Sequence, residues 1–162
     1  YGLMTGCVIH TTLVAFGVSE ILKRNQNLFF IIKLFGAGYL LYLALMVYKS
    51  SSEIAFSTEK VEQKTTFQLF KIGFWMNVLN PKVTIFFLAF FPQFLFSTEI
   101  STVIQFYVLG GLFILTSFIV FSTIAILAGN IAVYTKNHKN AGVFFKWLQI
   151  IVFVGIAGLI LI

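Results

Sequence analysis

The chain has 162 residues, of which 59% are hydrophobic and only 10% are charged, and its formal net charge is +6. A soluble domain is about 45–50% apolar and about 25% charged. This composition therefore excludes an ordinary soluble globule, and it excludes a disordered chain because disordered chains are polar and charge-rich. The basic residues are scattered and form no polar, basic face of the kind that binds nucleic acid. We predict a polytopic protein of the lipid bilayer, with no nucleic-acid partner.

Long apolar runs, separated by polar connections, predict the membrane spans. They cover residues 1–22, 28–48, 67–96, 102–133 and 143–162. A spanning helix needs about 20 apolar residues, and no run alternates polar and apolar residues as the strands of a membrane barrel do. We therefore predict an all-α membrane protein, with residues 1–162 forming a single transmembrane domain of about five helices.

Lysine and arginine are distributed unevenly between the two sides of this predicted bundle. One side holds at most Lys23, Arg24 and Lys33. The other side holds a larger set, namely Lys49, Lys60, Lys64, Lys71, Lys136, Lys139 and Lys146. Because positive residues favour cytoplasmic connections, we predict a cytoplasmic loop at 49–66, a cytoplasmic turn at 136–142 and a C-terminus outside. The odd number of spans and a first residue other than Met predict a further helix before this chain.

The third apolar run is interrupted at Asn80-Pro81-Lys82. In a continuous helix Pro81 would clash with the carbonyl of Asn77, whereas Asn is a favoured N-cap and Pro a favoured first helical residue. About 14 Å of helix would separate Lys71 from Asn80, which is about half of an apolar core roughly 30 Å thick. We predict that a half-helix begins at Asn80-Pro81, deep in the membrane.

Such a half-helix would present a positive dipole end, which transporters use to hold substrate carboxylates. Lys82 would add a full positive charge, and an intramembrane lysine is by default a functional hypothesis. The alternative is a simple proline kink, with Lys82 either extended toward the membrane surface or paired within the bundle.

Small residues predict where helices approach one another. Gly2, Gly6, His10 and Gly17 share one face of the first predicted helix, and small residues on a face indicate helix packing. His10 on this face is either a hydrogen-bonded core histidine or a proton relay. Further predicted packing positions are Gly36, Gly38 and Gly73. Such faces pack within one chain or between chains, so a homo-oligomer is left open.

Other chemistries find little support in the sequence. One Cys, two His and no Asp make a poor metal site. Neither a nucleophile elbow nor a P-loop spacing is present. We expect no metal, no cofactor and no enzymatic activity.

Several segments together carry a resemblance to a known family. They are Gly36-Ala37-Gly38-Tyr39-Leu40, the stretch from Gly73 through Asn77 to Lys82, Phe86-Phe87 and Phe91-Pro92-Gln93-Phe94. In these segments the chain resembles the LysE/RhtB family of bacterial amino-acid exporters. The resemblance implies a six-helix inverted-repeat transporter of the cell inner membrane, of which the first helix, with its Pro-Gly-Pro motif, is absent here.

The resemblance also implies a function and a site. It implies export of amino acids or small amino-acid derivatives, driven by protons, by alternating access. The substrate path would include Asn80, Pro81 and Lys82, with Asn77 and Gln93 as neighbours. The coupled proton would be carried by His10 or Lys82.

Two other functions remain open at the level of sequence. The chain could be a non-transporting membrane fragment that is stable only with a partner helix or a second copy. It could also belong to an ion or metal exporter of the same wider superfamily, although its scarcity of Cys, His and carboxylates counts against a metal path.

Overall fold

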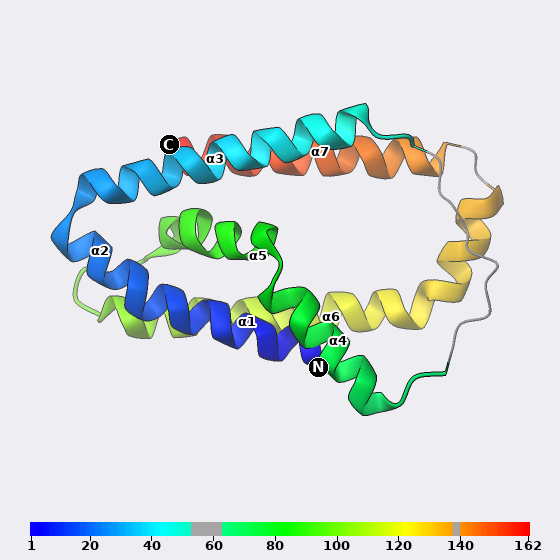
Figure 1. Cartoon of the computed structure of the whole chain (residues 1–162), viewed down its shortest axis with the longest axis horizontal. Helices are drawn as coiled ribbons and strands as arrows, with labels where there is room; N and C mark the ends of the chain where they lie inside the picture. The colour runs from blue at the N-terminus through cyan, green and yellow to red at the C-terminus, as the bar shows by residue number, and fades with distance from the viewer. Residues whose placement is uncertain (53–62, 138–139) are drawn as a thin grey trace.

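The computed structural model describes residues 1–52, 63–137 and 140–162, and within that part of the chain all regular structure is helical (Figure 1). The elements in chain order are α1 (Gly2–Leu13), η1 (Val14–Val18), α2 (Ser19–Arg24), α3 (Gln26–Lys49), α4 (Thr66–Val78), α5 (Pro81–Ile85), η2 (Phe86–Phe90), η3 (Phe91–Phe94), α6 (Thr102–Asn137) and α7 (Ala141–Leu161). Both η1 and η2 are single π-helical turns that continue an α-helix.

Length and apolarity identify the helices that could cross a membrane. In the part of the chain that the structure describes, four helical segments qualify, namely Gly2–Leu22, Asn27–Lys49, Thr102–Gly129 and Ala141–Leu161. A fifth is the pair Thr66–Val78 and Pro81–Phe94, if these two helices count as one span bent by 51°. The predicted all-α, polytopic membrane fold is confirmed. The predicted cytoplasmic loop 49–66 and turn 136–142 include residues 53–62 and 138–139, which lie outside the described residues.

The helices form two groups with the half-helix Pro81–Phe94 between them (Figure 1). In one group α3 and α7 lie side by side and run in opposite directions. In the other group α1 packs against both α4 and α6. The half-helix contacts the first group through η2 and the second group through η2 and η3.

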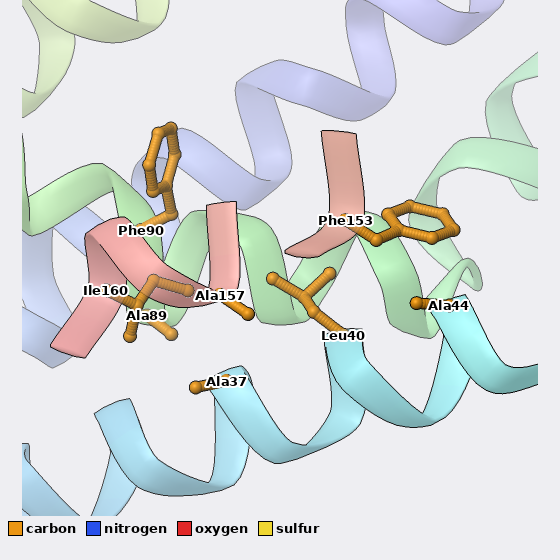
Figure 2. Packing of buried hydrophobic residues seen from close by; sticks show 8 residues of the cluster. All are labelled: Ala37, Leu40, Ala44, Ala89, Phe90, Phe153, Ala157 and Ile160. Carbon is orange, nitrogen blue, oxygen red and sulfur yellow. The ribbon is translucent and has the colours of Figure 1, made fainter. Parts of the chain in front are cut away.

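Each group shares an apolar cluster with the half-helix. The first cluster joins α3, η2 and α7 and consists of Ala37, Leu40, Ala44, Ala89, Phe90, Phe153, Ala157 and Ile160 (Figure 2). The second joins α1, η1, the half-helix and α6 and consists of Cys7, Val14, Ala15, Val18, Phe87, Phe91 and Phe106. Because Ala89 and Phe90 belong to one cluster while Phe87 and Phe91 belong to the other, the half-helix packs against both groups.

Small residues allow the close packing in the first cluster. Ala37 on α3, Ala157 on α7 and Ala89 on η2 lie together in Figure 2. A Cβ atom at Gly36 would collide with the Cβ of Ala89, so α3 can approach η2 this closely only with glycine at that position. Gly36 therefore lies at a helix contact.

Two glycines that were predicted to pack face open space instead. An added Cβ would meet no atom within 4 Å at either Gly38 or Gly17 among the described residues. Gly38 follows Gly36 by two residues, which at 3.6 residues per turn places it about 200° around α3. Gly17 lies in the π-helical turn η1, whose wider spacing rotates it off the face of Gly2 and Gly6. The described residues therefore give no packing contact at Gly38 or Gly17.

Gln105 holds the turn between η3 and α6, a role that the sequence analysis did not anticipate. Its side chain is 1% exposed. Its Oε1 accepts from the backbone N–H groups of Phe96 at 2.8 Å and Ser97 at 3.0 Å. Its Nε2 donates to the carbonyl oxygens of Ser97 and Ile100, each at 2.8 Å. One side-chain amide therefore satisfies four backbone groups of an irregular turn.

Replacing Gln105 with leucine should destabilise this turn. The substitution keeps a similar volume but leaves those backbone groups without their partner, which should lower the free energy of unfolding by about 2–4 kcal/mol. Thermal unfolding in detergent measures the effect. The control is Gln149→Leu, because Gln149 is exposed on α7. Equal melting temperatures for the two variants would show that Gln105 does not stabilise the fold.

Candidate functional site

The third span breaks between α4 and α5. The carboxamide oxygen of Asn80 accepts from the backbone N–H of Lys82 at 3.0 Å, so Asn80 caps the half-helix Pro81–Phe94. Pro81 occupies the first helical position, where no N–H is required. The hydroxyl of Thr84 donates to the carbonyl oxygen of Asn80 at 3.2 Å. The half-helix begins at the residues that the sequence predicts.

The face of α4 before the break packs against α1 through small residues. Asn77 is buried there, and an added Cβ at Gly6 would lie 2.5 Å from its Oδ1 atom. A Cβ at Gly73 would lie 3.4 Å from the backbone nitrogen of Leu3, and one at Gly2 would collide with backbone of α4. Gly2, Gly6 and Gly73 therefore lie where α1 and α4 are closest.

His10 connects α1 to the last turn of α4. Its Nε2 lies 3.1 Å from the carbonyl oxygen of Asn77. A carbonyl can only accept, so Nε2 carries the hydrogen and donates it. The imidazole is 2% exposed and stacks on the ring of Phe87 with 5.5 Å between centroids. His10 is thus a hydrogen-bonded part of the core, and it is bonded to the helix end beside the break.

The side-chain amide of Asn77 also lies in the contact between α1 and α4. Its Nδ2 lies 3.5 Å from Sγ of Cys7. Its Oδ1 is buried and has no hydrogen-bond partner among the described residues. The α1–α4 contact therefore contains a polar group that the fold leaves partly unsatisfied.

Lys82 turns toward the opposite side of the half-helix. Its Nζ lies over the ring of Phe153 on α7, 4.7 Å from the centroid. Its side chain is partly buried, and among the described residues no carboxylate is paired with it. A cation held on an aromatic face, without a counter-ion, can accept an anionic ligand without first breaking an ion pair.

A cavity of about 200 Å³ lies beside Lys82. Residues of α3, α5, η2, α6 and α7 line it, namely Leu40, Lys82, Val83, Phe86, Phe113, Phe153 and Ile156. Lys82 is the single charged residue in this set, and the others are aliphatic or aromatic. The arrangement is an apolar chamber between helices with one cation in its wall.

The structure places the predicted path residues in different surroundings. Lys82 lines the cavity, whereas Asn77 faces α1, Asn80 caps the half-helix and Pro81 is exposed. Gln93 donates from Nε2 to the carbonyl oxygen of Ala89, 3.4 Å away on its own helix. Of the five, only Lys82 is a wall residue of this cavity.

Most of the residues in the cavity wall could not be predicted from the sequence. Leu40, Phe113, Phe153 and Ile156 come from three helices that are far apart in the chain. With 21 phenylalanines in the sequence, no local pattern distinguishes a wall residue from a residue that faces lipid. Among the described residues no group of three or more His, Cys, Asp or Glu side chains could hold a metal ion.

Comparison with known proteins gives the family. The family model described as "LysE type translocator" matches residues 1–162. Two efflux proteins, from Salmonella typhi and Salmonella typhimurium (strain LT2), are each 33% identical to the chain over 139 residues. Both are named "Homoserine/homoserine lactone efflux protein". The alignments cover 86% of this chain and 66% of each relative, so the chain spans just under two thirds of their length.

No solved structure shows significant similarity to the chain. The family match, in contrast, extends from the first residue to the last and includes the broken third span with its lysine. This multi-pass membrane protein therefore belongs to the LysE type translocator family.

Proposed function

We propose that the protein exports amino acids or small amino-acid derivatives across the cell inner membrane. The observation that carries the proposal is the cation of Lys82, which has no carboxylate partner among the described residues and lies in the wall of a chamber between helices of both groups. Membership of a translocator family and the efflux names of the two relatives support it.

Binding would begin with the substrate carboxylate. In an apolar chamber an ion pair is much stronger than in water because the local dielectric constant is low. The carboxylate would draw the ammonium of Lys82 away from the ring of Phe153, 4.7 Å below it. The positive end of the half-helix Pro81–Phe94 would add to the attraction.

Transport would follow from movement of the half-helix between the two groups. It shares one apolar cluster with α3 and α7 and another with α1 and α6. A shift of one group against the other would open the chamber first to one side of the membrane and then to the other, as in alternating access. We also propose that loop 49–66 and turn 136–142 lie in the cytoplasm and that the C-terminus lies outside.

The coupled proton has two candidate carriers. His10 is bonded to the helix end beside the break, at 3.1 Å from the carbonyl of Asn77. Lys82 lies in the chamber itself. The surroundings of both side chains, His10 and Lys82, would change if the half-helix moved.

One efflux experiment tests the function and separates these carriers. Proteoliposomes containing the full protein are loaded with a labelled amino acid, and efflux is followed with and without a pH gradient. We expect the gradient to accelerate efflux. If Lys82 carries the proton, Lys82→Arg should abolish the acceleration, because arginine does not deprotonate in proteins. If His10 carries it, His10→Gln should do so instead.

The control for both variants is the rate without a gradient, which reports protein that is folded and able to bind. No efflux of any amino acid from wild-type proteoliposomes would contradict the proposed function. Efflux that ignores the gradient would contradict proton coupling alone.

A further inference from the structure

The wall of the chamber beside Lys82 offers almost no hydrogen bonds. Apart from that lysine, its lining side chains are those of Leu40, Val83, Phe86, Phe113, Phe153 and Ile156. None of these side chains carries a donor or an acceptor. A hydroxyl on a bound molecule would lose its water partners on entry and gain no protein partner, which is unfavourable.

The volume of the chamber is enough for a small ligand. One water molecule takes about 30 Å³ of liquid. A cavity of about 200 Å³ therefore holds a compound of roughly seven water-sized groups. An amino acid with a side chain of three non-hydrogen atoms has eight non-hydrogen atoms in all, which is close to this size.

The two ends of a zwitterion find partners at Lys82 and Phe153. The carboxylate pairs with the ammonium of Lys82, which in its absence lies 4.7 Å from the centroid of Phe153. Once Lys82 has moved toward the carboxylate, the freed face of Phe153 can hold the ammonium group of the ligand through a cation–π contact. The side chain of the amino acid then points at the aliphatic and aromatic wall.

We infer that this chamber selects amino acids with short apolar side chains over equally large amino acids that carry a hydroxyl. The inference rests on the proposed export function and names the substrate class of the same site. The inferred preference differs from the homoserine named for the two relatives, because apart from Lys82, which would hold the carboxylate, the described wall side chains offer no partner for the hydroxyl of homoserine.

Norvaline and homoserine provide a matched pair for the test, since they differ by a methyl group in place of a hydroxyl. Efflux from proteoliposomes containing the full protein is measured for each compound over a range of internal concentrations. We expect kcat/KM to be about 10- to 100-fold higher for norvaline, the range in which an apolar pocket rejects an isostere that adds a hydroxyl.

A second comparison adds a hydroxyl to the protein instead. Val83→Thr places one in the chamber wall with little change in volume, and it should shift the preference about 10-fold toward homoserine. Phe113→Tyr also places a hydroxyl in the chamber wall, from α6, and it replaces Val83→Thr in the test if that variant does not fold. The control is Val154→Thr, which changes an exposed position of α7 outside the chamber and should leave the preference unchanged.

The outcomes distinguish this inference from the proposed function. If homoserine is exported as well as norvaline and both depend on Lys82, export stands and the inferred selectivity is wrong. If Val83→Thr and Phe113→Tyr fold but leave the preference unchanged, the chamber is not the selective site. If neither compound nor any other amino acid is exported, the proposed function fails together with the inference.

Discussion

Lys82→Met is expected to abolish most of the export activity while leaving the protein folded. The variant keeps an unbranched chain of similar length in the chamber and removes the charge that would pair with a carboxylate. Loss of one partner of a desolvated charge pair costs about 2–5 kcal/mol. At about 1.4 kcal/mol per tenfold change, this corresponds to a fall in kcat/KM of roughly 30-fold to several thousand-fold. Efflux from proteoliposomes, normalised to the amount of folded protein, measures it.

Lys71→Met is the matched control for this experiment. Lys71 also holds its ammonium over an aromatic ring, 4.5 Å from the centroid of Phe67, but it is exposed and lies outside the chamber. The two variants remove the same charge from the same type of contact. Efflux at the wild-type rate from Lys82→Met, or an equal loss from Lys71→Met, would remove Lys82 from the substrate path.

Gly6→Leu is expected to prevent close packing of α1 on α4. Even a Cβ at this position would lie 2.5 Å from Oδ1 and 2.7 Å from Cβ of Asn77, so a full leucine side chain must separate the helices. Overpacking of this kind costs about 1–3 kcal/mol or more. The separation would also break the hydrogen bond from His10 to the carbonyl of Asn77. Yield of monodisperse protein and thermal unfolding in detergent report the loss.

The control for this prediction lies on the same continuous helical span. Gly17 has no atom within 4 Å of an added Cβ among the described residues, so Gly17→Leu should change the free energy of unfolding by no more than about 1 kcal/mol. If Gly6→Leu unfolds at the same temperature as Gly17→Leu, then α1 and α4 do not approach as closely as the structure shows.

Lys82→Met and Gly6→Leu test the two sides of the break at Asn80-Pro81. Before the break, α4 is bonded to α1 through His10, and after it the half-helix turns Lys82 toward α7. A continuous helix could not direct its two halves in this way. The 51° bend at Asn80-Pro81 therefore lets one pair of consecutive helices contact both helix groups.

The amino-acid sequence by itself determined the membrane class, the approximate spans and the break. These features depend on local chemistry: apolar runs long enough to cross a bilayer, and an Asn-Pro pair that caps one helix where another must end. The motifs from Gly36 to Phe94 also sufficed to identify the family, which the full-length match confirms. The roles predicted for Asn77, Asn80, Pro81 and Gln93 in a substrate path remain predictions.

Only the tertiary structure decided which residues surround Lys82. The side chains of Leu40, Phe113 and Phe153 come together from α3, α6 and α7, and a helix that is apolar on every side does not reveal which face meets a neighbour. The same reason explains why Gly36 and Gly38 could not be told apart in the sequence. In a membrane protein, lipid and protein interior favour the same residue types, so the packing of the helices, rather than their composition, defines the chamber.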